Sequence, residues 1–156
     1  MAGHTAEPFA VNLASAAFII VDMQNDFVRE GAGMEVPDAR ATIRPIQEVT
    51  RLFRTAKRPV VYTRFVAGPQ PTLLWTWSPQ IREPVNSCRI GLRRHYKDIG
   101  AEREVIAVID ELEVLPGDYV VDKYWYGAFF RTNLHDILLS EHVDTIAVCG
   151  TVTQIC

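Results

Sequence analysis

The sequence predicts an α/β protein with three layers, in which helices cover both faces of a parallel, Rossmann-like sheet. Short apolar runs rich in β-branched residues lie at 16–21, 59–63, 119–121 and 145–149. Runs of this kind are typical of strands that are buried on both faces. Segments with helical spacing of apolar residues separate these runs, and alternating elements indicate parallel pairing with right-handed crossovers.

The first helix is expected over residues 39–56, where Ile46 and Phe53 recur at helical spacing and Asp38 is a candidate N-cap. Pro45 interrupts the pattern. Since a proline suits the first turn of a helix, a start nearer Pro45 is the alternative.

Two further helices are expected over 102–112 and 132–139, because apolar residues recur there at helical spacing. Between residues 64 and 100 the periodicity disappears. An irregular segment of this length inside a compact domain usually serves a function or an interface.

Length and composition favour a single domain spanning residues 1–156. A chain of 156 residues with 48% hydrophobic and 22% charged residues can bury a core without disulfides or metals. The net charge of −3 gives no reason to expect a nucleic-acid partner.

The cysteine count and the apolar segments bear on the cellular compartment. Three cysteines form a poor disulfide framework and suit the reducing cytoplasm. No segment has the length and apolarity of a membrane span, and residues 1–8 lack the features of a secretory signal. We therefore expect a cytoplasmic protein without a membrane partner.

Reactive or polar residues follow three of the four expected strands. Asp22 ends the first, Lys123 ends the third, and Cys156 comes six residues after Gly150, which ends the fourth. In open parallel sheets ligands bind beyond the carboxyl ends of the strands. Taken singly, each residue has an ordinary structural interpretation: a turn residue for Asp22, a solvated strand end for Lys123, and a small buried group for Cys156.

Three motifs decide between these interpretations. I-I-V-D-M-Q-N-D-F (residues 19–27), D-K-Y-W-Y-G-A-F-F (122–130) and G-T-V-T-Q-I-C (150–156) resemble, in the same order, motifs of the isochorismatase-like cysteine hydrolases. The fragment F-F-R-T-N-L (129–134) resembles the ureidoacrylate and N-carbamoyl amidohydrolase branch. The resemblance implies an amidohydrolase that cleaves non-peptide C–N bonds of linear amides.

The resemblance also implies a catalytic triad of Asp22, Lys123 and Cys156, with the thiol as nucleophile. Asp22 would accept the thiol proton and later return it to the leaving amine. Lys123 would favour the thiolate by roughly one pKa unit or more. Asp26 and Asp122 are competing carboxylates, and we prefer Asp22 because Asp122 and Lys123 must point to opposite faces of a regular strand.

In the resembling family a cis peptide bond precedes the nucleophile, and backbone N–H groups beside it bind the oxyanion. By position the bond would be Thr151–Val152, and the donors would be the N–H groups of Val152 and Cys156. Thr153 and Gln154 either support this loop through side-chain hydrogen bonds or are simple turn residues.

Candidate substrate-binding residues come from the same motifs and from the end of the second strand. They are Gln24, Phe27, Arg64, Trp125 and Tyr126. A guanidinium can bind a carboxylate through two hydrogen bonds. An acidic ureido, carbamoyl or amide substrate is therefore one hypothesis, with Arg64 or an arginine among Arg89, Arg93 and Arg94 on its carboxylate. A solvated basic loop or a subunit contact, and core packing of the aromatic residues, are equally compatible with the sequence.

No cofactor and no metal are expected. The four histidines make no paired metal-ligand spacing. Metal-binding nicotinamidases of the resembling family carry Asp-x-His after the second strand, where this chain has Thr63-Arg64-Phe65. A Cys–His dyad through His135 or His142 is the alternative, although both lie in or near a helix without a motif.

Family members continue beyond the nucleophile, so we expect the C-terminal part of the fold to be absent from this sequence. The resemblance further implies a small-molecule substrate and a homodimer or homotetramer. Two alternative functions stay open: vinyl-ether hydrolysis of isochorismatase type with the Asp as acid, and a catalytically silent binding protein on the same fold.

Overall fold

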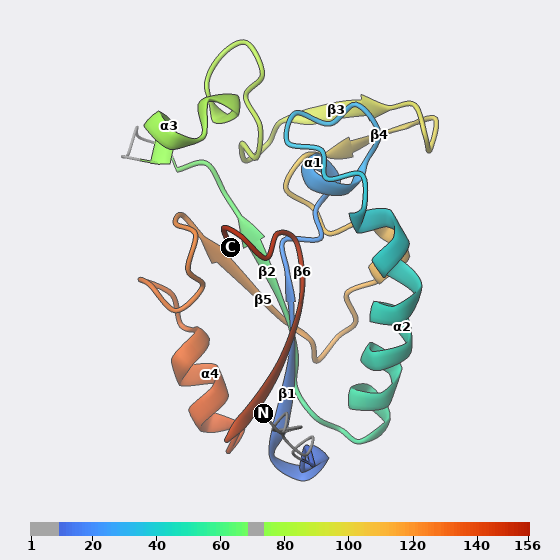
Figure 1. Cartoon of the computed structure of the whole chain (residues 1–156), viewed down its shortest axis with the longest axis vertical. Helices are drawn as coiled ribbons and strands as arrows, with labels where there is room; N and C mark the ends of the chain where they lie inside the picture. The colour runs from blue at the N-terminus through green and yellow to red at the C-terminus, as the bar shows by residue number, and fades with distance from the viewer. Residues whose placement is uncertain (1–9, 69–73) are drawn as a thin grey trace, which may run out of the picture.

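The computed structural model describes residues 10–68 and 74–156, and its centre is a parallel sheet between helices (Figure 1). The sheet holds β1 (Ala16–Val21), β2 (Val60–Phe65), β5 (Tyr119–Lys123) and β6 (Thr145–Gly150) in the order β5-β2-β1-β6. The α/β prediction and all four expected strands are confirmed. The expected absence of a signal falls on residues 1–8, which lie outside the described residues.

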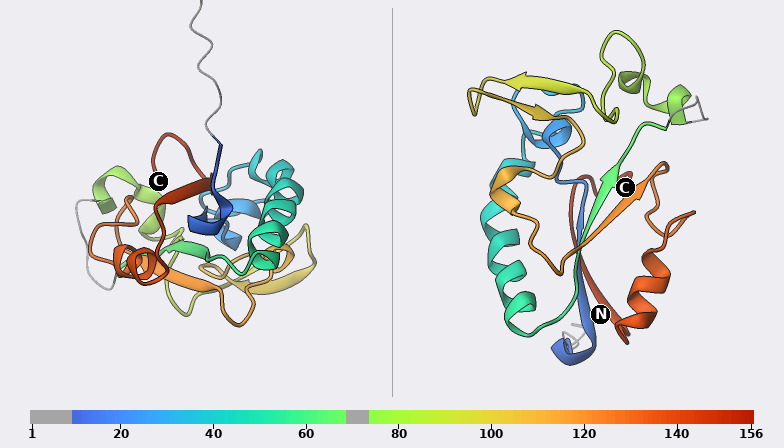
Figure 2. Two further views of the ribbon diagram at one scale, coloured as in Figure 1. Left: turned by 90° about the horizontal axis from the view of Figure 1, so that it is seen from below. Right: turned by 180° about the vertical axis from the view of Figure 1, so that it is seen from behind.

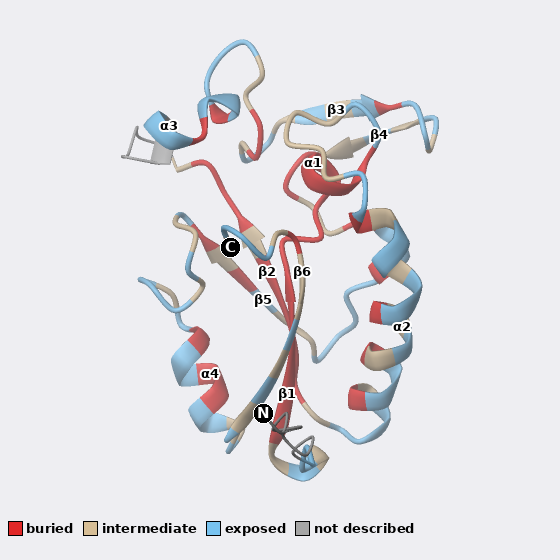
Figure 3. Ribbon diagram, viewed as in Figure 1, coloured by how far each residue is buried: buried red, intermediate tan, exposed pale blue. Residues whose placement is uncertain are grey.

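The central strand β1 is buried along its whole length, as Figure 3 shows. Its alternate residues face opposite sides of the sheet, where α2 (Ala39–Thr55) covers one face and α4 (Leu134–Ser140) the other (Figure 2). Phe18 stacks on Phe53 of α2, with ring centroids 5.4 Å apart, while Ile19 packs in the cluster that includes Leu134 of α4. This burial fixes the position of Asp22, which directly follows β1.

Helix α2 begins at Ala39, as expected, and not at the alternative start near Pro45. Pro45 lies inside the helix, where its missing N–H leaves the Ala41 carbonyl without the usual partner. The burial of Ile46 and Phe53 against the sheet offsets this loss. Asp38 precedes the helix but makes no side-chain capping hydrogen bond.

The prediction of a helix over 102–112 was wrong. Ala101–Glu104 is instead strand β4, which pairs antiparallel with β3 (Arg93–Tyr96), and only Asp110–Leu112 forms a 3₁₀ turn, η3. The reason is tertiary: Asn25 donates its side-chain N–H to the carbonyls of Glu104 and Ala107. These contacts hold the segment extended and override its helical spacing.

The unpatterned segment after β2 folds over the carboxyl edge of the sheet (Figure 1). It contains α3 (Leu74–Trp77), the 3₁₀ turn η2 (Pro79–Ile81) and β3. Residues 69–73 of it lie outside the described residues. At the start of the chain, η1 (Leu13–Ser15) leads into β1, and α1 (Asn25–Val28) follows Asp22. Within the described residues, no helix is long and apolar enough to cross a membrane.

Candidate active site

Asp22 follows β1 at the carboxyl edge of the sheet, and its side chain has no exposure to solvent. Its backbone has a φ of +51°, and its N–H donates to the Thr63 carbonyl over 3.2 Å. The Thr63 hydroxyl donates to Asp22 Oδ1 over 2.8 Å. In the described residues Oδ2 takes no aligned hydrogen bond, so this oxygen keeps a lone pair that can accept a proton.

Lys123 ends β5 and forms an ion pair with Asp22. Its Nζ lies 2.7 Å from Asp22 Oδ2, and both side chains are fully buried. The ammonium also donates to the Trp125 carbonyl at 3.4 Å and lies 5.3 Å from the centre of the Phe65 ring. The two buried charges therefore compensate each other, and neither is left unpaired in the interior.

Cys156 reaches the same edge from the loop that follows β6. Gly150 turns the chain with a φ of +114°, and a Cβ there would lie 2.1 Å from the Val21 carbonyl oxygen, so only glycine fits. Thr151 then binds back to the first strand: its N–H donates to Val21 O and its hydroxyl to Asp22 O. These bonds bring the Cys156 loop to the residue that carries the carboxylate.

The thiol of Cys156 responds to both charged partners. Its pKa is raised to about 12, first by burial and then by the Asp22 carboxylate, while Lys123 acts in the opposite direction. The expectation that Lys123 favours the thiolate holds in direction, but burial and Asp22 outweigh the ammonium, so the net shift of the thiol pKa is upward. The resting thiol is protonated and lies within the field of a carboxylate that can take its proton.

The peptide bond Thr151–Val152 is cis, as the resemblance implied. In the loop after it, the Ile155 N–H donates to the Val152 carbonyl. Neither Val152 N–H nor Cys156 N–H donates to any acceptor in the described part of the chain. Thr153 and Gln154 are exposed and make no side-chain hydrogen bond there, as turn residues would.

Gln24 and Phe27 hold the end of β2. The Gln24 side chain is fully buried, donates to Phe65 O over 2.9 Å and accepts from Phe65 N over 2.7 Å. Phe27 packs edge-on against the Phe65 ring with centroids 6.5 Å apart. These contacts place Phe65 under the Lys123 ammonium, so both residues act on the site through Phe65.

Arg64 does not meet the triad. Neighbouring residues of a strand face opposite sides, and Arg64 lies across from Asp122, not from Lys123. Its guanidinium binds the Asp122 carboxylate through two hydrogen bonds of 2.6 and 2.8 Å. The Arg64 guanidinium is thus already paired with a carboxylate of the protein itself, and it lies on the sheet face opposite Lys123.

Trp125 and Tyr126 are half-buried beside Lys123. Trp125 packs edge-on against Phe130 at 5.5 Å, and the Tyr126 hydroxyl hydrogen-bonds with the Ser78 hydroxyl over 2.9 Å. Tyr126 therefore joins the loop after β5 to the segment after α3, while the contact of Trp125 stays within the loop after β5.

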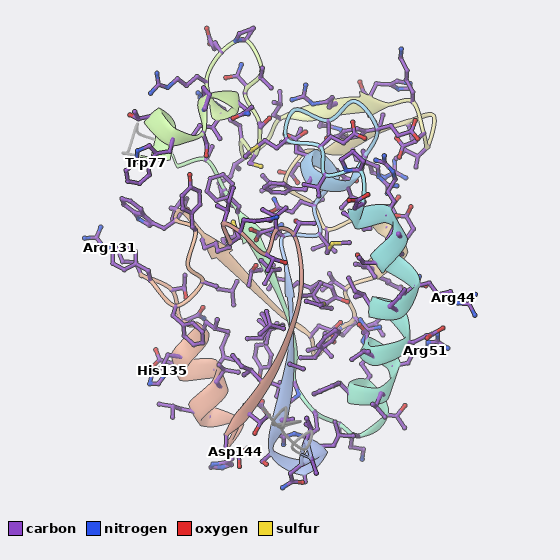
Figure 4. All side chains as sticks on the ribbon, viewed as in Figure 1. Arg44, Arg51, Trp77, Arg131, His135 and Asp144 are labelled. Carbon is purple, nitrogen blue, oxygen red and sulfur yellow. The ribbon has the colours of Figure 1, made fainter. Side chains whose placement is uncertain are left out.

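His135 and His142, the alternative bases, lie away from the site. His135 points away from the sheet on the outer side of α4 (Figure 4), and His142 is exposed. In the described ranges, 10–68 and 74–156, no group of three His, Cys, Asp or Glu side chains is placed to hold a metal ion.

Thr63 and Thr151 were not predicted as contributors to this site. Both bind Asp22, and the only available signal was that parallel strand ends meet at one edge. Asp26, the competing carboxylate, instead accepts hydrogen bonds from Cys88 and Tyr96, which no local pattern connects to it.

A hollow of about 340 Å³ opens beside the nucleophile candidate. It lies on the outer side of β6 and the loop after it. Its lining consists of Val21, Val148, Cys149, Gly150, Thr151, Val152, Thr153 and Cys156. The Cys156 side of the site is thus the accessible one, whereas Asp22 and Lys123 are sealed beneath it.

Comparison with known proteins gives concordant results. The family model described as "Isochorismatase domain" matches residues 16–156. Ureidoacrylate amidohydrolase from Rhizobium rhizogenes is 27% identical over 160 residues, covering 96% of this chain and 64% of that protein. A cysteine hydrolase from Pseudomonas syringae pv. phaseolicola has a TM-score of 0.82 at 27% identity, over 97% of this chain and 68% of the other. N-carbamoylsarcosine amidase from Thermoplasma acidophilum has a TM-score of 0.68 at 30% identity, over 91% and 70%.

Proposed function

Because this chain belongs to the isochorismatase family, which its match over residues 16–156 shows, we propose that it is a cysteine-dependent hydrolase of small molecules. It cleaves a non-peptide C–N bond in an amide, ureido or carbamoyl substrate. The observation that carries the proposal is the buried Asp22–Lys123 ion pair, which acts on the Cys156 thiol from the carboxyl edge of the sheet.

The first half of the reaction forms a thioester or thiocarbamate. The Cys156 sulfur attacks the substrate carbonyl carbon while its proton passes to Asp22 Oδ2, the oxygen that also faces the Lys123 ammonium. The N–H groups of Val152 and Cys156 stabilise the oxyanion. The intermediate then collapses, the C–N bond breaks, and the amine leaves with the proton held by Asp22.

The second half releases the product. Water attacks the thioacyl or thiocarbamoyl carbon and gives its proton to Asp22, and the Cys156 sulfur leaves and recovers a proton. Lys123 compensates the carboxylate throughout, and the Thr63 hydroxyl fixes its orientation. The raised pKa of the Cys156 thiol suits this scheme. The thiol keeps its proton until a substrate carbonyl group is present to be attacked, and the proton then moves to Asp22.

The proposed substrate class rests on the similar proteins and on the two aromatic residues that follow Lys123 closely. Two of the similar proteins are named for ureido and carbamoyl substrates. Such substrates carry a planar, polar carbonyl group that the half-buried Trp125 and Tyr126 can flank. A homodimer or homotetramer is part of the proposal, as is a small-molecule ligand.

A substrate panel with matched cysteine variants tests the proposal. Ureido acids, carbamoyl acids and simple amides are incubated with the protein, and ammonia release is measured for the wild type, Cys156→Ala and Cys149→Ala. We expect Cys156→Ala to abolish release. Cys149→Ala should retain release, with at most a changed KM, because Cys149 lines the hollow but burial alone, and neither Asp22 nor Lys123, shifts the pKa of its thiol. Activity that survives Cys156→Ala would indicate an Asp-only route such as vinyl-ether hydrolysis. Silence of the wild type across the panel would favour a binding role.

A further inference from the structure

Asp26 is a fully buried carboxylate that the proposed reaction does not use. Two hydrogen-bond donors and one arginine from a distant segment surround its carboxylate. Its Oδ2 accepts the Cys88 backbone N–H over 2.9 Å, its Oδ1 accepts the Tyr96 hydroxyl over 2.9 Å, and Arg94 Nε lies 3.2 Å from Oδ1. One side chain in the first motif therefore fastens the whole stretch 88–96.

Residues 88–96 lie beside the end of β2, on the side opposite Lys123. Beyond the end of β2, the Val66 N–H donates to Lys123 O over 2.9 Å, and the next N–H, from Ala67, donates to Cys88 O over 2.8 Å. Successive N–H groups of an extended chain point to opposite sides, so Lys123 and Cys88 flank the extended end of β2. Cys88 is thus held at both of its backbone polar groups: its carbonyl accepts from Ala67, and its N–H donates to Asp26.

The Cys88 side chain is fully buried, in a backbone conformation with a φ of +56°. Burial raises the pKa of its thiol well above the usual range; Asp26 and Asp22 raise it further, while Lys123 acts in the opposite sense. Cys88 thus lies among the charges of the candidate site as a neutral, compact group.

We propose that Asp26 is a positioning residue, whose carboxylate fixes Cys88 beside the end of β2 so that residues 88–96 form one wall of the space at Asp22, Lys123 and Cys156. The inference rests on the proposed function and deepens it, because it names a segment that shapes the site. Asp26 touches no reacting atom and acts through the backbone that it holds.

The test compares Asp26→Asn with a matched carboxylate elsewhere in the fold. Asp118 also accepts a backbone N–H, from Leu115, and pairs with an arginine, Arg54, but it lies before β5 at the far end of the sheet. The full chain carrying Asp26→Asn, Tyr96→Phe or Asp118→Asn is alkylated with iodoacetamide under native conditions. The rate at each cysteine is read by peptide mass spectrometry, and kcat and KM for ammonia release are measured in parallel.

We expect Cys88 to be alkylated at least about tenfold faster in Asp26→Asn, while Cys149, the internal reference for global unfolding, keeps its rate. KM should rise with a smaller change in kcat, and Tyr96→Phe should show the same pattern more weakly. Asp118→Asn should change neither the Cys88 rate nor KM. If Asp26→Asn does not fold, Tyr96→Phe decides by the same criteria.

Unchanged Cys88 labelling together with an unchanged KM would overturn the inference. Faster labelling of Cys88 and Cys149 alike would also overturn it, because Asp26 would then stabilise the whole fold and not this wall. If no variant and no wild-type protein releases ammonia, the proposed function fails, but selective labelling of Cys88 would still support the positioning role.

Discussion

Lys123 shows at the level of one residue how stability and chemistry are linked in this site. Replacing it with methionine leaves the Asp22 carboxylate buried without its ion-pair partner. We expect Lys123→Met to lower the free energy of unfolding by about 3–5 kcal/mol and to abolish ammonia release. Urea denaturation followed by circular dichroism measures the first effect.

The partly exposed pair Arg64–Asp122 supplies the control for this prediction. Its side chains are 25% and 36% exposed, so Arg64→Met should cost no more than about 1 kcal/mol. Equal losses for the two variants would contradict the importance of burial at Lys123. Adding Asp22→Asn to Lys123→Met should recover part of the lost stability, because it removes the uncompensated charge.

The Cys156 thiol makes a second residue-scale prediction, on pH. Since its pKa in the folded protein is about 12, alkylation of Cys156 by iodoacetamide should rise about tenfold per pH unit above pH 9 without the plateau near 8.5 of a free cysteine. Asp22→Asn should accelerate alkylation at pH 8, because it removes a charge that opposes the thiolate. A plateau near pH 8.5 in the wild type would refute the raised pKa.

The sign of the linked stability effect follows from the same shift. The unfolded thiol loses its proton near pH 8.5, whereas the folded thiol keeps it to about pH 12. Between these values the unfolded state binds fewer protons, so this group's contribution to stability is full below pH 8.5 and declines as the pH rises toward 12.

At the scale of elements, the junction of β1 and β6 depends on Gly150. An alanine there would place its Cβ 2.1 Å from the Val21 carbonyl oxygen, at a φ of +114°. We expect Gly150→Ala to destabilise the protein by about 3 kcal/mol or more, since the clash adds to the backbone cost, and to displace the Cys156 loop. Thermal unfolding and ammonia release measure the two effects.

Gly117 separates the clash from the backbone cost. It has a φ of +102°, but a Cβ there meets nothing within 4 Å. Gly117→Ala should therefore cost only the backbone term, about 1–2 kcal/mol, and leave ammonia release intact. Similar losses for Gly117→Ala and Gly150→Ala would mean that the close approach to Val21 has no energetic weight.

The comparison of expectation and structure is also clearest at the level of elements. Strands β1, β2, β5 and β6 were predictable because each contains a short apolar run rich in β-branched residues. The expected burial on both faces is correct for β1, whereas β6 at the edge of the sheet is partly exposed. The segment 102–112 was not, because its extended form depends on the side chain of Asn25, some 80 residues earlier. Likewise, the ion pair of Arg64 with Asp122 depends on strand order, which local sequence does not contain.

Across the whole molecule, the meeting of the three candidate residues was predictable, but their electrostatics were not. Motif resemblance grouped Asp22, Lys123 and Cys156, and the structure brings their loops to one edge. The size of the opposing effects of burial and Asp22 on the thiol pKa could not be predicted, because burial is a property of the assembled fold. The same holds for Asp26, whose two hydrogen-bond donors and arginine partner all come from one distant segment.

The exposed edge strand β6 leads to a prediction about the whole molecule in solution. Among the described residues no strand pairs with the outer edge of β6, and its side chains Ile146 and Val148 are 40% and 59% exposed. An unpaired edge with exposed apolar side chains is prone to pair with another chain. We expect concentration-dependent self-association, measured by light scattering, that Val148→Lys weakens without loss of folding stability. Leu52→Lys on α2, where Leu52 is 55% exposed on a helix with no free edge, should leave association unchanged. Equal effects of the two lysines would mean that added charge, and not the β6 edge, governs association.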